Sequence, residues 1–457
     1  MSAAASPVRN PDLKNTPLMT KRAWILVALN VLIPGSPQLI AGNRRLGRFG
    51  VGATFLLWAL VLAGVVLFFV AQSLLITVAT NWWALWVIQA LIVFYVVLWV
   101  ILTLDTLRLV RLVRVDGAAR GFVAGLSVIL LVVIGGAGAY GAMIAGSTRD
   151  TVGAVFADGQ IEPPIDGRYN ILLLGGDAGP DREGLRPDSI SVASIDAETG
   201  ETVIFGLPRN MEYMPFPEDS PMFPEYPNGY GADVGCYVDV CYLNSVYTEV
   251  ELYLPDYYPD AVANGSRPGI EGTKDAVEGV LGLQIQYYAM IDMAGFEQLI
   301  NALGGIEIDV KERLPIGGDE DEFGNPINVG AWLEPGVQRL DGNRALWYAR
   351  SRHGTSDYDR MSRQREVQEA ILRQFEPSNV LARFQEVAAA GTQVVTTNIP
   401  QPMLGAFTQL ALKARDHEVV DIDFVPANGF DPEFPDYAYI RQVVADAVAP
   451  PVEEPAE

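Results

Sequence analysis

Three long apolar segments near the start of the chain constrain its architecture more than any other feature. They are residues Val51–Ala71, Trp83–Leu104 and Phe122–Ile144. Because a helix rises about 1.5 Å per residue, about 20 apolar residues cross a hydrocarbon core about 30 Å thick. Each segment therefore predicts a transmembrane helix. A cleaved signal peptide is disfavoured, because it would have one shorter apolar core.

A fourth apolar stretch, residues 23–42, is interrupted in its middle by Pro34, Gly35, Ser36 and Pro37. Two prolines and a glycine break a helix that would otherwise cross the bilayer. We therefore expect a re-entrant or interfacial hairpin here, and the alternative is a fourth crossing.

The distribution of Lys and Arg decides between three crossings and four. Three cationic clusters flank the apolar segments: Lys14, Lys21 and Arg22; Arg44, Arg45 and Arg48; Arg108, Arg111, Arg114 and Arg120. Short loops rich in these residues stay in the cytoplasm. All three clusters can stay in the cytoplasm only if residues 23–42 do not cross the membrane. This predicts a cytoplasmic segment 1–22, a membrane module 23–146 and an extracytoplasmic remainder.

The remainder differs sharply in charge from the membrane module. Up to Arg149 the chain has 12 Lys/Arg and 3 Asp/Glu, a balance of +9, whereas the rest has 20 and 52, a balance of −32. Such an acidic domain repels polyanions, so we expect no nucleic-acid partner. We divide it into a linker 147–167, a catalytic domain 168–448 and a disordered acidic tail 449–457.

Three short apolar runs predict neighbouring strands: Tyr169–Gly175, Ser189–Ile195 and Thr202–Leu207. If they run up, down and up, the end of the first, the start of the second and the end of the third meet at one sheet edge. The residues placed there are Asp177, Asp188 and Arg209. Two carboxylates and an arginine suit Mg²⁺ holding a phosphate, and the alternative is that both aspartates are ordinary turn residues.

The chain beyond these strands alternates helices and strands. We expect helices over residues 241–252 and 269–281, a strand over 286–291, a helix after Asp292 and a strand over 306–310. This alternation predicts an α/β fold, a layered α/β/α domain with a central mixed sheet, preceded by the helical transmembrane module.

An arginine-rich segment, residues 341–365, stands out in the acidic domain with six arginines. A helix beginning near Asp357 turns about 100° per residue, which directs Arg360 and Gln364 toward the core. The same wheel directs four residues to solvent: Arg365, Glu366, Glu369 and Arg373. A buried guanidinium needs an anionic partner. The alternatives are a pyrophosphate and a salt bridge to Asp341, Asp357 or Asp359.

The only two cysteines, Cys236 and Cys241, lie five residues apart. They lack the second ligand pair of a zinc site. A local disulfide and two free thiols both remain open.

Five stretches together resemble the LytR-CpsA-Psr family of envelope glycopolymer transferases, particularly its actinobacterial branch. They are NILLLGGDAGPDREGLRPDSISVASID, FGLPRNM, LNSVYT, GFEQLINALGGIEIDV and LDGNRALWYARSRHGTSDYDRMSRQRE. The resemblance covers about Tyr169 to Asp431. It departs from the family pattern where residues 178–182 follow the first aspartate, and where Pro187 replaces a threonine.

The resemblance implies an α/β domain with an apolar groove for a polyprenyl chain and an arginine-lined mouth for its pyrophosphate. It implies that Asp177 and Asp188 hold Mg²⁺ and, with Arg209, carry catalysis. The positions that match pyrophosphate binding are Arg209, Arg350, Arg352, Arg360 and Gln364, with Arg363 adjacent.

The function implied is a phosphotransferase. It would move an arabinogalactan-like or teichoic-acid-like glycopolymer from polyprenyl pyrophosphate to a peptidoglycan hydroxyl, forming a phosphodiester. Two alternatives remain open: a pyrophosphatase that uses water as the acceptor, and a non-catalytic membrane lipid sensor or transcriptional attenuator.

Overall fold

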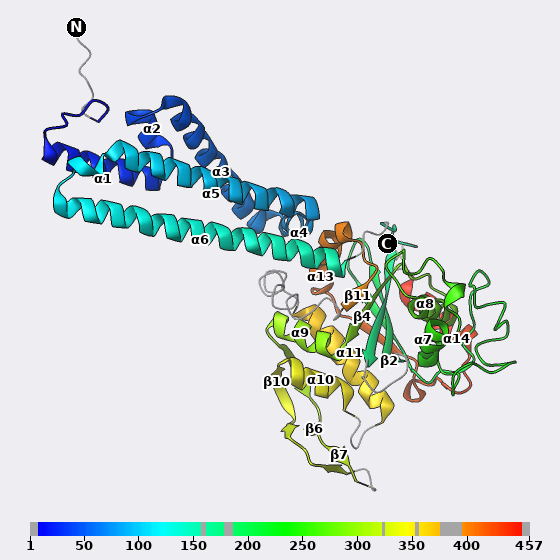
Figure 1. Ribbon diagram of the computed structural model, residues 1–457. Coiled ribbons are helices and arrows are strands. Elements are labelled where there is room, and N and C mark those ends of the chain that lie inside the picture. Colours follow the sequence, from blue (N-terminus) through cyan, green and yellow to red (C-terminus); the bar gives the residue numbers. More distant parts are fainter. Residues whose placement is uncertain are drawn as a thin grey trace, which may run out of the picture. The chain divides into compact units, whose positions relative to one another are not determined.

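The structure, a computed structural model, describes residues 8–156, 161–177, 186–321, 325–351, 356–374 and 395–449 (Figure 1). It divides the chain into two compact units, Met1–Asp150 and Thr151–Glu457. Each unit is described by itself.

All regular secondary structure in the described residues of the first unit is helical. Its helices are α1 (Thr16–Leu32), α2 (Ser36–Ala41), α3 (Arg44–Val70), α4 (Gln72–Thr80), α5 (Trp82–Val110), the 3-10 helix η1 (Leu112–Arg114) and α6 (Gly117–Val155), whose end belongs to the second unit. Within the described part of the chain, three helical stretches are long and apolar enough to cross a membrane: Arg44–Val70, Trp82–Arg114 and Gly117–Asp150. They contain the three predicted spans, except that the first helix ends at Val70, one residue before the predicted end.

The helix break expected in residues 23–42 is present. Helix α1 ends at Leu32, and Gly35, with φ of 97°, precedes α2. A Cβ atom on Gly35 would lie 2.6 Å from the backbone nitrogen of Val51, and one on Gly47 would lie 2.5 Å from that of Leu39. The α1–α2 hairpin therefore packs against α3 at a distance that only glycine permits. Its depth in a membrane stays a prediction.

Neutral polar side chains join this hairpin to α5. Asn30 donates to the hydroxyl of Thr103 over 2.9 Å, and Gln38 donates to the carbonyl of Leu102 over 2.9 Å. The side chains of Asn30, Gln38 and Thr103 are buried. Such bonds are expected where apolar surroundings make an unpaired polar group costly.

The second unit is built on a six-stranded sheet in the order β11-β4-β1-β2-β3-β12. The strands are β1 (Arg168–Asp177), β2 (Arg186–Asp196), β3 (Thr202–Leu207), β4 (Tyr287–Asp292), β11 (Val395–Thr397) and β12 (Val420–Asp423). Strands β1, β2 and β3 run alternately up and down as predicted, whereas β4 is parallel to β1 and β12 is parallel to β3. The sheet is therefore mixed.

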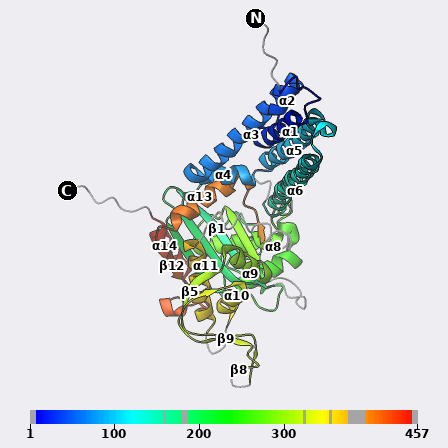
Figure 2. The same cartoon turned by 90° about the vertical axis from the view of Figure 1, so that its left-hand side faces the viewer.

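Helices cover both faces of this sheet (Figures 1 and 2). One layer consists of α7 (Leu243–Leu252), α8 (Pro268–Leu281) and α14 (Tyr437–Val448), which share the larger core with the sheet. The other layer consists of α9 (Met293–Leu303), α10 (Gly342–Arg350) and α11 (Asp357–Arg373), whose buried residues form a second core. The layered α/β/α prediction is confirmed.

Residues 306–340 form hairpin-like pairs outside the central sheet. The strands are β5 (Ile306–Val310) with β10 (Gly336–Leu340), β6 (Leu314–Ile316) with β9 (Ala331–Leu333), and β7 (Asp319–Glu320) with β8 (Pro326–Ile327). The predicted strand 306–310 is thus present but belongs to a separate two-stranded sheet. The remaining described helices are α13 (Leu404–Ala414) and the 3-10 helices η2 (Pro255–Tyr257), η3 (Gln401–Met403) and η4 (Pro426–Asn428).

Candidate active site

The edge of the sheet where the predicted site residues meet contains a β-bulge. Gly175 pairs with Ser189, but Gly176 pairs with Pro187, so Asp188 is an extra residue in β2. Bulges of this kind redirect a side chain at a sheet edge. Asp177 ends β1 at the same edge, although its side chain lies outside the described residues. The strand geometry thus brings Asp177, Asp188 and the end of β3 together.

Arg209, two residues after β3, binds two carboxylates. Its Nη1 lies 2.5 Å from Oδ1 of Asp188, and its Nε lies 3.3 Å from Oδ2 of Asp357. The three side chains are between 27% and 29% exposed. They are therefore partly accessible to a ligand.

Arg360 reaches the same place from the first turn of α11. It is 2% exposed, and its Nη2 lies 3.0 Å from Oδ2 of Asp357 and 3.2 Å from the backbone carbonyl oxygen of Asp188. Of the two alternatives for Arg360, the structure contains the salt bridge to Asp357. Asp357 is shared with Arg209, however, so the result is a cluster rather than an isolated pair.

We call this group the arginine–aspartate cluster; its members are Asp188, Arg209, Asp357 and Arg360. From the sequence, Asp188, Arg209 and Arg360 are expected at one site, and the structure brings these three residues together. The sequence predicts Asp357 only as a salt-bridge partner of Arg360, and its position in the first turn, three residues before Arg360, is the signal for this contact.

Arg350 lies at the same end of the sheet without a described contact to the cluster. Its side chain is exposed, with Nη1 3.0 Å from Sδ of Met293 and Cζ 5.2 Å from the centre of the Trp347 ring. Met293 follows Asp292, which pairs with Gly176 beside the end of β1. Arg352, also predicted to bind pyrophosphate, lies outside the described residues.

Arg363 and Gln364 hold the end of α10. Arg363 donates to the backbone carbonyls of Tyr348, at 3.0 Å, and Ser351, and its Nη1 lies 3.4 Å from Oε1 of Glu312. Burial lowers the pKa of Arg363, and Glu312 opposes that shift. Gln364 donates to the carbonyl of Ala349 over 3.3 Å. Both side chains thus fix the segment that carries Arg350. The family resemblance implied instead that Gln364 binds the pyrophosphate, with Arg363 adjacent or also binding.

The predicted exposure of Arg365 is wrong. The residue is 2% exposed, with Nη1 2.6 Å from Oε1 of Gln368 and Nε 3.7 Å from Oδ1 of Asp423. Burial lowers the pKa of Arg365 and raises that of Asp423, and the attraction between the two opposes both shifts. The cause is β12, which the sequence did not predict and which carries Asp423 beside this flank of α11.

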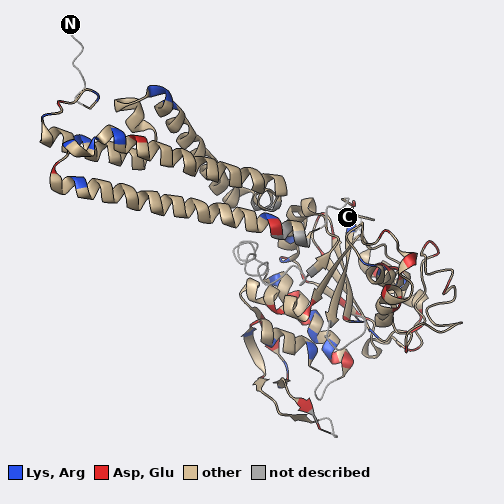
Figure 3. Ribbon diagram, in the orientation of Figure 1, with Lys and Arg blue, Asp and Glu red and all other residues tan. Residues whose placement is uncertain are grey.

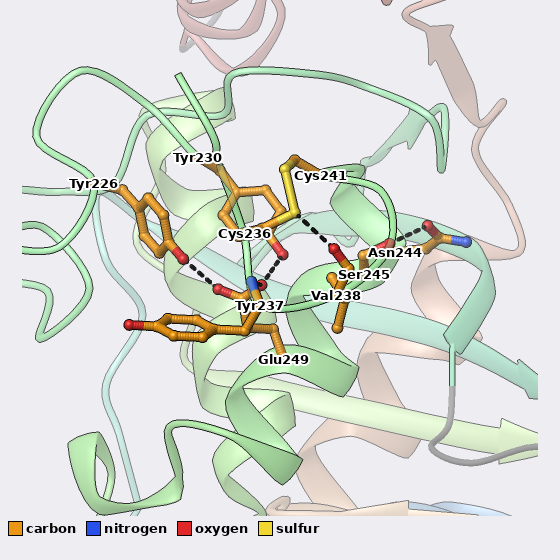
Figure 4. The surroundings of a disulfide bond; sticks show 9 residues. All are labelled: Tyr226, Tyr230, Cys236, Tyr237, Val238, Cys241, Asn244, Ser245 and Glu249. Atoms are coloured by element: carbon orange, nitrogen blue, oxygen red, sulfur yellow. Dashed lines mark hydrogen bonds between the residues drawn. A yellow bond between two sulfur atoms is a disulfide. The ribbon is translucent and has the colours of Figure 1, made fainter. Parts of the chain in front are cut away.

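Cys236 and Cys241 form a disulfide, one of the two alternatives left open (Figure 4). The bond closes a loop in the segment between β3 and α7. It lies close to Glu249, which Figure 4 shows among tyrosine side chains.

The donor chemistry of the sheet edge fits a divalent cation. Mg²⁺ typically takes one or two protein carboxylates and completes its shell with water and substrate oxygens. Asp188 supplies a carboxylate at the edge, and Asp177 ends the neighbouring strand. Among the described residues, no group of three or more His, Cys, Asp or Glu could hold a metal ion. A cation at this edge would be held by Asp177 and Asp188, with water and substrate oxygens completing its shell.

The predicted apolar groove stays a prediction. Two hollows on the described part of the second unit lie elsewhere. One is lined by residues that include Lys311, Glu312 and Arg363, and the other by residues that include Glu225 and Tyr237.

Comparison with known proteins gives relatives over the α/β domain. Regulatory protein MsrR of Staphylococcus aureus is 28% identical over 244 residues, which is 53% of this chain and 60% of MsrR. The polyisoprenyl-teichoic acid–peptidoglycan teichoic acid transferase TagU of Enterococcus faecalis is 28% identical over 235 residues, 50% of this chain and 61% of TagU. The chain thus spans about six tenths of the length of these curated relatives.

Among solved structures, the crystal structure of Bacillus subtilis TagV is 21% identical with a TM-score of 0.42, covering 62% of this chain and 97% of TagV. The family model described as the LytR_cpsA_psr family matches residues 147–439, more than half of the chain. That stretch contains all four members of the arginine–aspartate cluster, and the chain therefore belongs to the LytR-CpsA-Psr family.

Proposed function

We propose that the chain is a Mg²⁺-dependent phosphotransferase that moves a glycopolymer from a polyprenyl-pyrophosphate carrier to a peptidoglycan hydroxyl. The main support is the arginine–aspartate cluster. In this cluster the carboxylate of Asp357 joins the buried guanidinium of Arg360 to Arg209 at an accessible edge of the sheet. Arginine forks match phosphate oxygens and cannot lose their charge at neutral pH. The name of the relative TagU, a polyisoprenyl-teichoic acid–peptidoglycan transferase, supports the same substrates.

The charge balance of the cluster supports a metal requirement. Two arginines and two aspartates sum to zero, which gives no net attraction for a doubly charged pyrophosphate. A bound Mg²⁺ on Asp177 and Asp188 would neutralise carboxylate charge and polarise a phosphoryl oxygen. Arg209 and Arg360 would then orient the pyrophosphate, and exposed Arg350 would approach its outer oxygens.

In the proposed reaction, an acceptor hydroxyl oxygen attacks the phosphorus next to the polymer. A new phosphorus–oxygen bond forms, the pyrophosphate bridge breaks, and polyprenyl monophosphate leaves with the electron pair. The hydroxyl proton passes to the carboxylate of Asp177 or Asp188. The protein contributes positioning and charge stabilisation rather than a covalent intermediate.

We further propose that the second unit works outside the cytoplasm, with the N-terminus inside. The cationic clusters flank the apolar helices on the side expected to stay cytoplasmic, and Figure 3 shows acidic residues concentrated in the second unit. The Cys236–Cys241 disulfide supports an oxidising compartment. The actinobacterial branch stays a prediction from the sequence motifs.

The direct test incubates the purified full chain with a lipid-linked donor, a peptidoglycan acceptor and Mg²⁺. We expect a phosphodiester-linked product and its loss in an Arg350→Ala, Arg360→Ala double variant. The control is Arg313→Ala, which removes an exposed arginine that stacks on Trp332 outside the cluster. Unimpaired transfer by the double variant would refute the proposal.

Product analysis separates the alternatives. Free polymer phosphate in place of wall-linked polymer would identify a pyrophosphatase. Lipid binding that depends on Arg360, without turnover of any donor and acceptor pair, would identify a sensor. The name of the relative MsrR, a regulatory protein, is compatible with this alternative.

A further inference from the structure

The segment Asn210–Val262 has a composition that the proposed chemistry does not use. It holds nine of the 18 tyrosines in the chain and ten Asp/Glu, but no Lys or Arg. It leaves the sheet directly after Arg209 and returns there, because the amides of Leu243 and Asn244 donate to the carbonyls of Met211 and Arg209 over 3.0 and 3.1 Å. The segment is therefore anchored at the cluster.

A buried carboxylate fixes this segment from inside. Glu249 of α7 is fully buried and accepts hydrogen bonds from the hydroxyl of Tyr226, the hydroxyl of Tyr230 at 2.7 Å and the backbone amide of Tyr237 at 2.9 Å (Figure 4). The Cys236–Cys241 disulfide closes the loop that carries Tyr237. The backbone of Tyr237 is thus held in place, while its ring is directed outward.

Two exposed rings lie nearly parallel on this fixed base. The rings of Tyr237 and Tyr253 are each 55% exposed, with centroids 6.3 Å apart and planes inclined by 18°. The carboxylate of Glu225 accepts hydrogen bonds from the hydroxyls of Tyr237, at 3.2 Å, and Tyr257, at 3.3 Å. We call Glu225, Tyr237, Tyr253 and Tyr257 the tyrosine platform.

A hollow adjoins the platform. Its lining includes Glu225, Tyr226, Val234 and Tyr237. Val234 is 71% exposed, so the rim combines an apolar side chain with a carboxylate and aromatic rings.

We propose that the tyrosine platform binds an uncharged oligosaccharide. Tyrosine rings offer an apolar face and a polar edge, which suits the carbon–hydrogen faces and hydroxyls of a sugar. Glu225 is an acceptor for sugar hydroxyl donors. With ten carboxylates and no cation, the segment repels polyanions, which excludes a phosphate-rich polymer from this surface.

The distance between the platform and the cluster sets the length of a ligand that contacts both. Helix α7 has 10 residues, and its start adjoins Arg209 while Tyr253 follows its end. At 1.5 Å per residue the helix spans about 15 Å. A saccharide that contacts both the platform and the cluster must therefore be an oligosaccharide. Its source is either the acceptor glycan or the polymer of the donor, and this part of the inference rests on the proposed function.

Binding is tested without transfer activity. Full chain in lipid nanodiscs is titrated calorimetrically with a neutral β-1,4-linked N-acetylglucosamine hexasaccharide and, separately, with a poly(glycerol phosphate) chain. We expect the hexasaccharide to bind, the polyanion not to bind, and a Tyr237→Ala, Tyr253→Ala variant to weaken hexasaccharide binding about tenfold or more. Tyr237→Phe, which keeps the ring, should retain most of the affinity.

The matched control is Tyr439→Ala on α14, because Tyr439 is also exposed and stacks on Phe430. If the double variant does not fold, Tyr253→Ala alone decides, since that ring lies at the surface. Absent binding by the unaltered chain, equal binding by the platform variant, or tighter binding of the polyanion would each overturn the proposal.

Transfer kinetics then identify the source of the saccharide. A raised KM for the acceptor with unchanged kcat assigns the platform to the acceptor glycan, and a raised KM for the donor assigns it to the polymer. If both KM values stay unchanged in the platform variant, the platform has no part in transfer. Failure of transfer by the unaltered chain would count against the proposed function and leave the binding result standing.

Discussion

Two arginines on one helix show how surroundings decide what a buried charge can do. Arg360 and Arg365 lie five residues apart on α11, and each is 2% exposed beside an aspartate. The partners of Arg360 are 27% to 29% exposed at a sheet edge, whereas Asp423 beside Arg365 is 15% exposed. The first arginine belongs to a site that a ligand can enter, and the second belongs to the interior.

The largest effect is expected from Arg365→Ala. Removing one member of a buried ion pair leaves Asp423 without its partner, which typically costs about 3–5 kcal/mol of stability. The measurement is denaturant unfolding of the full chain in detergent, followed by near-UV circular dichroism. An Arg365→Met, Asp423→Leu double variant should recover most of the loss, because it removes both charges. A double variant as unstable as the single one would contradict this account.

Asp357→Asn tests the arginine–aspartate cluster, the more accessible of the two sites compared. Arg209 and Arg360 would lose the negative charge of the carboxylate that they share. We therefore expect the rate of glycopolymer transfer to fall roughly 100-fold. Stability should fall by less than in Arg365→Ala, about 1–2 kcal/mol, because Asp357 and Arg209 are partly exposed and only Arg360 is buried. Initial transfer rates and the unfolding midpoint measure the two quantities. A large stability loss with normal transfer would show that the cluster is structural.

Gly206→Ala probes the space around the interior pair. A Cβ atom on Gly206 would lie 1.8 Å from Oδ1 of Asp423, so the carboxylate must move. Overpacking of this kind costs about 1–3 kcal/mol, measured by the same unfolding experiment. The control is Gly330→Ala, where the nearest atom would be 3.4 Å away. Equal stability of the two variants would show that the interior pair tolerates displacement.

Glu278, on the helix layer that covers the other face of the sheet, is a half-buried acid that accepts a hydrogen bond from the amide of Ile285 over 2.7 Å. Burial raises its pKa from 4.5 to about 7. The pKa of Glu278 is therefore higher in the folded chain than in the unfolded chain. The contribution of Glu278 to the free energy of unfolding is complete below about pH 4.5 and is lost as the pH rises through about 7. Glu278→Gln should therefore stabilise the chain by about 1–2 kcal/mol at pH 8 and have little effect at pH 4.5.

The measurement is the difference in unfolding free energy between the Glu278→Gln variant and the unaltered chain across this pH range. Glu433→Gln, an exposed substitution, serves as the control. A difference that does not change with pH would disprove the linkage.

Local sequence signals predicted much of the fold. Helix α11 begins at Asp357 as expected, with Ser356 and Asp359 forming a capping box, and its period directs Arg360 and Val367 inward. The apolar runs gave β1, β2 and β3 and hence the edge that joins Asp188 to Arg209. These features depend on residues close in sequence, so the pattern is visible without a structure.

Contacts between distant segments could not be predicted in this way. The four-residue strand β12 pairs with β3 more than 200 positions earlier, and its length is too short for a periodic signal. It is this strand that buries Arg365. Strand β5 was predicted from its own residues, but its pairing with β10 outside the main sheet depends on a partner about 30 positions away.

The sequence by itself determined three apolar helices, the proline–glycine break before them, the alternation of strands and helices, and the arginines of the sheet edge. Only the tertiary structure decided that Asp357 joins Arg209 to Arg360, that Arg365 is interior, and that Glu249 gathers the tyrosines beneath the platform. The physical reason is that periodicity and chain-breaking residues act over a few neighbours. Partner choice for a buried charge, in contrast, depends on which distant segment supplies the nearest counter-charge or hydrogen bond.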